Sequence, residues 1–356
     1  MISKIRKVID PINYIGRYND GHRDLVKGLQ NGLQITKEQK KEILAYWKTY
    51  RNSFIAKTSF DIKWYNIYNK TNVFGFDLKK YIPDSFYYCV VDSFFNDSQA
   101  ALALDDKNLY DFLFHDVNQP KTICRKQDGV YLDANYNVVT ENDALNLCKD
   151  NGCVIIKPAV DACAGAGIVK WVDDNSNDDK LKEAFKKTRT FVGQDILKQS
   201  LTLAKFNESS VNTMRIVTLM LGGEVHVVTA VVIIGGRGAT TNHLHGGGMC
   251  CGILPDGQLM KYAFDGKLNQ YEQHPCGAVF SKFKIPNYDK CISLVKELAP
   301  RLYRVSKLVA WDISLNQSDE PVLIETNLRW GGSVQIAAGP VFGDMTEDVL
   351  NWISKK

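Results

Sequence analysis

Three side chains that could bind a cation lie near the end of the sequence. Asp312 falls within residues 309–315, and Glu325 and Asn327 fall within residues 322–327. In both segments apolar residues occupy every second position, which is typical of a half-buried β-strand. The sequence therefore predicts two carboxylates and an amide on neighbouring strands.

The two segments are expected to form a β-hairpin around a turn at residues 317–320. If Asn316 opposes Pro321, the register places Asp312 directly opposite Glu325. Carboxylates in this position repel one another. A hard cation between them would offset the repulsion, and Mg²⁺ prefers a few carboxylates together with phosphate and water oxygens. The alternative is two solvated acids at an exposed hairpin edge, but the apolar residues beside both acids argue against it.

A second candidate is Arg215, which lies inside the apolar stretch 211–219. This stretch predicts a strand, and an arginine buried in a strand needs a partner for its charge. The partner is either an acidic neighbour in the protein or a carboxylate or phosphate of a ligand, which the planar guanidinium binds through two parallel hydrogen bonds.

Lys157 lies at the end of the apolar segment 153–157, shortly before a loop of small residues at 161–167. Gly165 and Gly167 would let backbone N–H groups approach a phosphate closely, and the lysine would add positive charge. The spacing matches neither a P-loop nor a dinucleotide-binding fingerprint. A plain tight hairpin explains the same glycines, so both interpretations stay open.

A glycine-rich loop follows the predicted strand 225–234. It contains Arg237, Asn242, His245 and Gly247, a composition typical of a mobile loop that closes over a substrate. Its H-x-H pair could bind zinc, but no third ligand has suitable spacing. We therefore expect a substrate loop rather than a zinc site.

The elements that must position these residues change in type along the chain. Residues 1–98 are expected to be mainly helical with aromatic-rich connections, and Thr36 and Gln39 form a capping box ahead of a helical run at 43–50. Pro83 and Asp84 predict a turn. Nothing in this region indicates chemistry.

From Asp106 onwards, helices and strands alternate. Asp106 and Lys107 are expected to open a helix that extends to residue 114. A short strand is predicted at 122–124, and a helix at 140–151.

Residues 191–197 predict a further strand, with Gln194 and Asp195 at its end, which would connect two lobes. Residues 288–305 predict an amphipathic helix that packs on the sheet. His274 lies in a turn with a proline and a glycine, and we expect it to be structural rather than catalytic.

The composition is that of a soluble globular protein. The chain has 356 residues, of which 45% are hydrophobic and 24% charged, enough for two or three domains. No apolar run is long enough to cross a membrane, and the first residues lack the apolar core of a secretory signal. The nine cysteines show no zinc-finger spacing, which is typical of reduced thiols. We therefore expect a cytoplasmic protein.

The net charge of +4 is unevenly distributed, because residues 1–80 hold sixteen Lys and Arg against seven Asp and Glu. Such an excess suits anionic lipid, a polyanionic glycan or nucleic acid. The sequence has no recognition helix or aromatic platform for nucleic acid, so we expect no nucleic-acid partner. A solvated helical surface is an equal alternative, and residues 2–9 could form a short amphipathic helix in weak contact with the inner face of a membrane.

Several of these residues together resemble the ATP-grasp superfamily, and within it the sugar-transfer-associated proteins found with capsule and exopolysaccharide biosynthesis. The resemblance is carried by SSVNTMRIVTL at 209–219, the loop at 237–248, HPCG at 274–277, and WDISL and PVLIETN with downstream Gln335. It implies an α+β fold in which two α+β lobes clamp a nucleotide after a mainly helical N-terminal region. The implied boundaries are 1–98 for that region, 99–197 for the central lobe and 198–356 for the C-terminal lobe.

The resemblance also implies a role for each candidate residue, with ATP and Mg²⁺ as cofactors. Lysines and glycines would hold the phosphates, the connector would lie along the adenine and ribose, and arginines would steady the transferring phosphoryl group or a carboxylate. The residues are, for ATP, Lys107, Lys157, Gly165, Gly167, Gln194, Asp195 and Leu197; for catalysis, Arg215 and Arg237; for the substrate, Asn212, Asn242, His245, Gly247 and Gln335; and for Mg²⁺, Asp312, Glu325 and Asn327.

By this resemblance, the first hypothesis is an ATP-dependent carboxylate–amine ligase that works through an acyl phosphate. Its partners would be a small carboxylate and an amine, one of them a sugar or a sugar-linked precursor, in surface-polysaccharide assembly. The second hypothesis is a kinase that uses the same nucleotide site to phosphorylate a small molecule or sugar. The third is a non-catalytic module that binds a glycan or a lipid-linked precursor.

Overall fold

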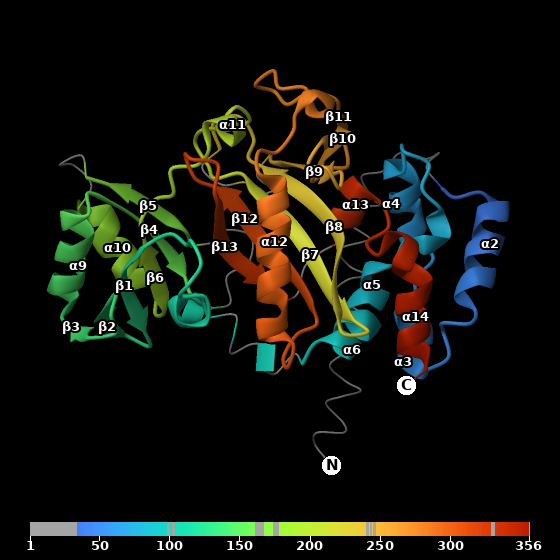
Figure 1. Ribbon diagram of the computed structural model, residues 1–356, viewed down its shortest axis with the longest axis horizontal. Helices are drawn as coiled ribbons and strands as arrows, with labels where there is room; N and C mark the ends of the chain where they lie inside the picture. The colour runs from blue at the N-terminus through green and yellow to red at the C-terminus, as the bar shows by residue number, and fades with distance from the viewer. Residues whose placement is uncertain are drawn as a thin grey trace, which may run out of the picture.

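Two antiparallel sheets, each with helices packed against it, make up the structure. Figure 1 shows the smaller sheet at one end of the molecule, the larger sheet in the middle and the N-terminal helices at the other end. The predicted α+β class is thus confirmed. The structure is a computed structural model that describes residues 34–97, 100–101, 104, 106–160, 167–173, 178–239, 242, 244, 247–328 and 332–355.

The lobe at one end is built on a six-stranded sheet in the order β3-β2-β1-β6-β4-β5. Two helices pack on it, and their apolar faces bury Leu145, Leu181 and Phe185 in a core that belongs to this lobe. The first of these helices confirms the helix predicted at 140–151, and the structure shows that it starts with a capping box at Thr140. The elements are β1 (Thr122–Gln127), β2 (Val130–Asp133), β3 (Val138–Val139), α9 (Glu141–Asp150), β4 (Cys153–Pro158), β5 (Val169–Val172), α10 (Asp178–Lys187) and β6 (Phe191–Gln194).

The central sheet has seven strands in the order β11-β10-β9-β8-β7-β12-β13, with every neighbouring pair antiparallel. The helix α12 crosses one face of it (Figure 1). The elements of this part are α11 (Leu201–Ala204), β7 (Thr213–Leu221), β8 (Glu224–Ile234), β9 (Met249–Ile253), β10 (Leu259–Asp265), β11 (Gln270–Tyr271), η5 (Phe280–Lys282), α12 (Tyr288–Leu298), η6 (Ala299–Leu302), β12 (Leu308–Leu315) and β13 (Pro321–Asn327).

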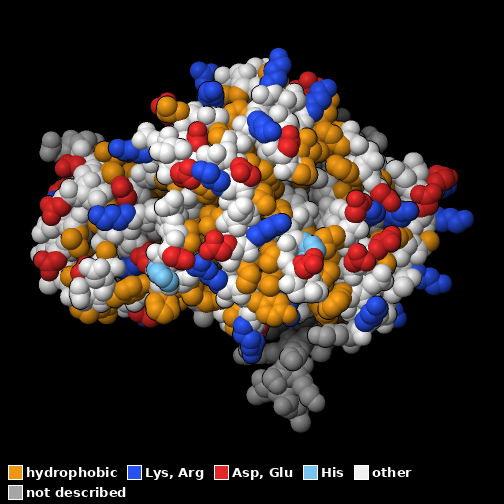
Figure 2. Space-filling view, viewed as in Figure 1, with side chains coloured by type: hydrophobic (Ala, Val, Ile, Leu, Met, Phe, Trp, Pro, Cys, Tyr) orange, Lys and Arg blue, Asp and Glu red, His pale blue; other side chains and the backbone are white. Residues whose placement is uncertain are grey.

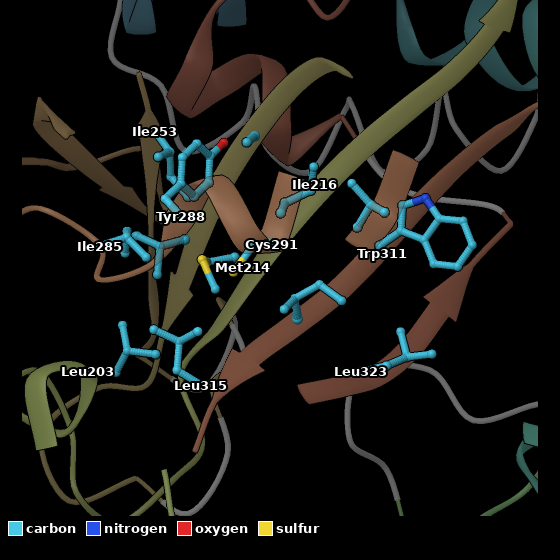
Figure 3. Packing of buried hydrophobic residues seen from close by; sticks show 14 of the residues in the cluster. Leu203, Met214, Ile216, Ile253, Ile285, Tyr288, Cys291, Trp311, Leu315 and Leu323 are labelled. Carbon is cyan, nitrogen blue, oxygen red and sulfur yellow. The ribbon is translucent and has the colours of Figure 1, made fainter. Parts of the chain in front are cut away.

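The face of the central sheet beneath α12 is apolar. Met214 and Ile216 of β7 and Trp311 of β12 are fully buried there, and Cys291 of α12 packs beside Met214 (Figure 3). Burying a side chain of this size contributes roughly 1.5–3 kcal/mol to stability. The indole Nε1 of Trp311 also donates to the Thr218 hydroxyl at 2.8 Å, so its one polar atom is satisfied.

The opposite face of the central sheet is covered by helices from both ends of the chain. Trp47 and Phe86 from the N-terminal region and Leu350 from the last helix are buried in one core with Val217 and Leu308 of the sheet. The N-terminal region therefore packs on the central sheet as part of its core. Its helices are α2 (Lys37–Trp47), α3 (Phe54–Ser59), α4 (Trp64–Thr71), η1 (Leu78–Lys80), α5 (Asp84–Phe86), the π-helix η2 (Tyr87–Asp92) and α6 (Ser93–Phe95), and the C-terminal ones are α13 (Ser333–Ala338), η7 (Gly343–Met345) and α14 (Thr346–Ser354).

The mainly helical character predicted for the N-terminal region is confirmed for residues 34–97. The capping box of Thr36 and Gln39 is present at the start of α2. The amphipathic segment predicted at 2–9 lies outside the described residues.

Residues 106–118 lie between the two sheets. The predicted helix start is present, because the Asp106 carboxylate accepts a hydrogen bond from the Asn108 N–H at 2.9 Å. The Tyr110 hydroxyl lies 2.9 Å from the Thr326 hydroxyl of β13, so this segment is fixed to the edge of the central sheet. The predicted helix is divided into η3 (Lys107–Leu109) and α8 (Tyr110–Leu113).

Two predicted elements are shorter than expected. The strand predicted at 191–197 ends at Gln194 and lies inside the six-stranded sheet, so the connection between the lobes begins after it. The helix predicted at 288–305 ends at Leu298, because Pro300 has no N–H with which to continue an α-helix.

On the face shown in Figure 2, acidic and basic side chains are interspersed, and neither sign gathers into one patch. Within the described ranges, no helix combines the length and the apolar character needed to cross a bilayer.

Candidate functional site

The residues predicted to bind a metal lie side by side on the central sheet. Asp312 of β12 pairs with Arg215 of β7 on one side and with Glu325 of β13 on the other. Directly paired residues share a face of a sheet, so these three side chains lie together on the face opposite α12. Asn327 pairs with Ala310, two residues further along on the same face. We call Arg215, Asp312, Glu325 and Asn327 the charged row.

The predicted pairing of Asp312 with Glu325 and the turn within residues 317–320 are confirmed, but Asn316 does not oppose Pro321 as the predicted register assumed. Leu315 pairs with Pro321, so the loop between the strands is one residue longer than expected. A β-bulge next to this pair adds one residue to β13 and restores the pairing. Without the bulge, Ile324 would oppose Asp312 and Glu325 would point to the other face.

Arg215 and Asp312 form a bidentate ion pair at the centre of the charged row. The arginine Nε donates to Asp312 Oδ1 and its Nη2 donates to Oδ2, both at 2.8 Å. Burial disfavours the charge of the guanidinium, but the Asp312 carboxylate raises the pKa of Arg215 above its usual value, so it remains protonated. Of the two partners that the sequence allowed for this arginine, the acidic neighbour is present.

The donor set of the charged row fits a magnesium ion. Asn327 Nδ2 donates to Asp312 Oδ2 at 3.1 Å, and half a turn of that amide would offer its oxygen instead. A carboxylate can accept about four contacts, so Asp312 can bind a cation while Arg215 holds it. Within the described residues, no three His, Cys, Asp or Glu side chains cluster as metal ligands. A metal here would therefore depend on two carboxylates, one amide and the oxygens of a ligand or water.

Glu325 carries the negative charge with the least compensation. Burial, and after it the Asp312 carboxylate, raises the pKa of Glu325, whereas Lys107, Arg215 and Lys157 lower it. The nearest of these cations is Lys107, whose Nζ lies 3.6 Å from Glu325 Oε2. A divalent cation at this position would stabilise the charged carboxylate more strongly than a lysine does.

Lys157 faces Glu325 from the six-stranded lobe. Its Nζ donates to Gln194 Oε1 at 3.1 Å, and Gln194 Nε2 donates to the Pro120 carbonyl at 3.3 Å. Burial lowers the pKa of Lys157 to about 8, Glu325 raises it, and the like charge of Lys107 lowers it. Two lysines therefore face a carboxylate where the two lobes adjoin, an arrangement that suits phosphate groups bound together with a cation.

Asn212 has a different place from the one predicted. Its side chain is completely buried, and Nδ2 donates to the carbonyls of Leu203 and Asn207, both at 2.9 Å, and to Gln199 Oε1 at 3.2 Å. Its Oδ1 accepts the N–H of Gly235 at 3.3 Å. These contacts contradict the prediction that Asn212 binds a substrate. Instead, Asn212 supports the start of the glycine-rich loop from within the protein.

Gln335 also has a structural place. The side chain is 1% exposed, its Nε2 donates to the Ile82 carbonyl at 2.8 Å, and its Oε1 accepts the Ile82 N–H at 3.0 Å. This pair of hydrogen bonds fastens α13 to the N-terminal region. The prediction that Gln335 binds a substrate is therefore contradicted as well.

The small-residue loop between β4 and β5 is described only at its end. Gly167 has a φ of 77°, and a Cβ at this position would lie 2.8 Å from Pro158 Cγ, so the tight hairpin itself requires a glycine there. Gly165 lies outside the described residues. The phosphate-binding role of both glycines stays a prediction.

The glycine-rich loop after β8 is also described in part. Arg237 is exposed, Gly247 has a φ of 86°, and Asn242 Nδ2 donates to the Thr213 hydroxyl at 2.8 Å. His245 and the other histidine of the H-x-H pair lie outside the described residues. The substrate and catalytic roles of this loop stay predictions.

The residues predicted to lie along the nucleotide base follow β6. The Asp195 carboxylate accepts the Ile196 N–H at 2.8 Å, and it accepts Asn151 Nδ2 and the Cys153 thiol at 3.3 Å each. Asp195 therefore faces its own lobe, and the next side chain of the predicted set, Leu197, is half-buried. Their contacts with adenine and ribose stay predictions.

His274 is buried, as expected for a structural histidine. Its Nε2 lies 3.2 Å from the Gly235 carbonyl oxygen and its Nδ1 lies 2.9 Å from the Cys276 sulfur. Burial lowers the pKa of His274. The neutral ring thus links its turn to the start of the glycine-rich loop.

Sequence analysis missed Asp84, which is partly buried at the start of α5. Its carboxylate accepts the Gly332 N–H at 3.2 Å, and burial raises the pKa of Asp84 to about 7. The one local signal was an acid between Pro83 and the apolar stretch 86–95. Nothing in the local sequence predicts its contact with Gly332.

The family model for sugar-transfer associated ATP-grasp matches residues 91–351. Three solved structures are similar to this chain. D-alanyl-alanine synthetase A from Vibrio cholerae is 13% identical over 77% of this chain and 66% of its own, with a TM-score of 0.40, and L-amino acid ligase from Bacillus licheniformis is 15% identical over 69% of this chain and 48% of its own, with a TM-score of 0.40. D-alanine–D-alanine ligase from Bacillus anthracis is 12% identical over 74% of this chain and 73% of its own, with a TM-score of 0.43. This chain thus spans less than two thirds of the first two. No curated protein matches it.

Proposed function

We propose that this chain, which belongs to the sugar-transfer associated ATP-grasp family, is an ATP-dependent ligase. The family match confirms the predicted resemblance and, with the two α+β lobes, the predicted ATP-grasp fold. The activity, the cofactors ATP and Mg²⁺, and the substrates are the proposal.

The observation that supports the proposal is the meeting of cations and carboxylates between the lobes. Lys107 and Lys157 face Glu325, which lies beside the ion pair of Asp312 and Arg215. The lysines would bind the phosphates of ATP, and the two carboxylates with Asn327 would hold Mg²⁺. ATP supplies the phosphoryl group, and Mg²⁺ offsets the charge of its phosphates.

The chemistry requires activation of an acid. A carboxylate is a poor electrophile, so an amine attacks it only after phosphorylation to an acyl phosphate. Arg215 would stabilise the charge of that carboxylate or of the transferring phosphoryl group, because Asp312 engages only two of its five N–H groups. The glycine-rich loop would exclude water that hydrolyses the acyl phosphate.

In its finer form, the proposed reaction joins an amine to a carboxylated sugar, or an acid to an amino sugar, during surface-polysaccharide assembly. The association of the family with sugar transfer supports a sugar as one of the two partners.

The test is incubation with Mg·ATP, hydroxylamine and a panel of uronic acids and amino acids. We expect one acid to yield a hydroxamate by mass spectrometry, together with ADP and phosphate. A stable phosphorylated product that forms without hydroxylamine would identify a kinase instead. Absence of both products, and of Mg·ATP binding by calorimetry, would contradict the proposal in favour of a non-catalytic module.

A further inference from the structure

A pocket of about 160 Å³ lies on the face of the central sheet opposite α12. Helices α4 and α13 and the strands β9 and β10 supply most of its lining, which is mainly apolar and aromatic. An apolar cavity of about 150 Å³ accepts a molecule the size of benzene. The lining includes Trp64, Tyr68, Cys250, Phe264, Leu268 and Ile336.

The pocket shares its sheet face with the charged row. Arg215 pairs with Val231 of β8, and Ile233, two residues further on the same strand, pairs with Cys250 in the pocket lining. Two strand spacings of ~4.8 Å and two residues of ~3.3 Å place Cys250 roughly 12 Å from Arg215 between Cα atoms. Burial raises the pKa of Cys250 to about 12, and the positive charge of Arg215 opposes this shift.

Asp84 places a carboxyl group in the apolar lining. The Gly332 N–H donates to it at 3.2 Å, and a Cβ at Gly332 would collide with the carboxyl group, so any larger residue there would displace the Asp84 side chain. Burial raises the pKa of Asp84 to about 7, against the opposing effects of Gly332 and Tyr68. A carboxylate in apolar surroundings favours a cationic partner, which offsets the loss of water.

Two other polar side chains of the lining, Asp265 and Tyr68, are engaged within the protein. Asp265 accepts the N–H groups of Lys267 and Asn269 at 2.8 and 2.9 Å, and the Tyr68 hydroxyl donates to the Ile82 carbonyl at 2.8 Å. A sugar ring carries several hydroxyl groups, and each of them needs a partner when it is buried. This lining suits a ligand with one charged group and an apolar body better than it suits a sugar.

We infer that the pocket holds the amine partner of the ligation: a small primary amine with an apolar or aromatic body, whose ammonium group faces Asp84. The inference rests on the proposed function, and it assigns the sugar to the carboxylate partner. The acid would then lie at the charged row, on the same face of the sheet.

The test is calorimetric binding of three probes in the absence of ATP: benzylamine, its uncharged analogue benzyl alcohol, and glucosamine. We expect the wild-type protein to bind benzylamine at least about 10-fold more tightly than the other two, the ratio that a charge-assisted hydrogen bond provides. Asp84→Asn should remove the preference over benzyl alcohol. The matched control is Asp344→Asn, because Asp344 is an exposed acid bonded to Lys80, and it should keep the preference.

A second measurement places the bound amine without changing Asp84. Trp64 lines the pocket, so benzylamine should change the tryptophan fluorescence of the wild-type protein. Trp64→Phe should bind benzylamine but lose most of the fluorescence change. An unchanged wild-type signal, equal binding of benzyl alcohol, or tighter binding of glucosamine would each overturn the inference.

The two proposals fail in different ways. Hydroxamate formation by a protein in which Asp84→Asn leaves benzylamine binding unchanged would refute the pocket assignment and keep the ligase. Benzylamine binding that depends on Asp84, in a protein that neither binds Mg·ATP nor forms hydroxamate, would refute the ligase and leave an amine site.

Discussion

The two faces of the central sheet use the same strands for different purposes. On the α12 side, Met214, Ile216 and Trp311 are buried among apolar neighbours, whereas Arg215 and Asp312, next to them in sequence, meet as a bidentate ion pair on the other side. Hydrophobic burial has no directional requirement, but an arginine–carboxylate pair depends on the register of its strands. One alternating pattern thus buries apolar side chains beneath α12 and places the charged row beside a second apolar core on the other face.

We therefore expect the two faces to be separable by mutation. Changes on the α12 side should lower the free energy of unfolding, and changes in the charged row should lower turnover while the fold is kept. Each experiment below tests this separation, beginning with the largest expected effect.

Glu325→Gln should reduce turnover by about 10³-fold or more, equivalent to roughly 4 kcal/mol of activation free energy, because an amide binds Mg²⁺ more weakly than a carboxylate does. The melting temperature should change little, since the side chain lies on the face away from the α12 core. ADP release and thermal unfolding measure the two effects. Turnover near the wild-type rate would show that Glu325 is not a metal ligand.

Trp311→Ala should lower the free energy of unfolding by about 3–5 kcal/mol, because it leaves a large cavity beneath α12. Trp311→Phe keeps an aromatic ring but loses the 2.8 Å hydrogen bond to Thr218, so it should cost less. Urea denaturation gives both values. Equal stability of the two variants would mean that the core closes around the smaller side chain.

Arg215→Lys should lower turnover roughly 10- to 100-fold, because lysine cannot form the two parallel bonds that hold Asp312. Its stability should exceed that of Arg215→Ala, in which the Asp312 carboxylate loses its counter-charge. Steady-state kinetics and denaturation of the two variants distinguish the effect of the bidentate guanidinium geometry from the effect of the positive charge. A fully active lysine variant would mean that charge alone is sufficient.

The smallest effect concerns pH. With a pKa of about 8, Lys157 loses its charge between pH 7 and 9, so the affinity for Mg·ATP should fall several-fold over this range. Without nucleotide, the unfolded chain binds the lysine proton up to its ordinary pKa of 10.5, so the free energy of unfolding should rise with pH between 8 and 10.5. Lys157→Met is the control in both titrations, and identical pH profiles for the two proteins would contradict the assignment.

The sequence predicted the elements that have a strong local pattern. The capping box at Thr36 and the alternation around Asp312 depend on neighbouring residues alone, and both appear in the structure. The strands β2 and β3 were not predicted, because segments of four and two residues are too short to show a period. The place of Gln194 inside its sheet depends on pairing with distant strands, which no local pattern contains.

The site was predictable where one hairpin supplies it. Asp312 and Glu325 belong to consecutive strands, so their pairing followed from alternation. The partner of Asp312, Arg215, is 97 residues away in sequence, and Asp84 is 248 residues from Gly332. Such contacts are set by the packing of whole elements, and this explains why Asp84 and its pocket became visible only in the folded chain.

Because of the bulge in β13, the pairing of Asp312 with Glu325 does not depend on the turn having four residues. A hairpin without the bulge, in which Asn316 opposed Pro321 across a turn one residue shorter, would also pair Asp312 with Glu325. One residue inside the strand can therefore compensate for a turn that is one residue longer, and the two acids stay opposite each other.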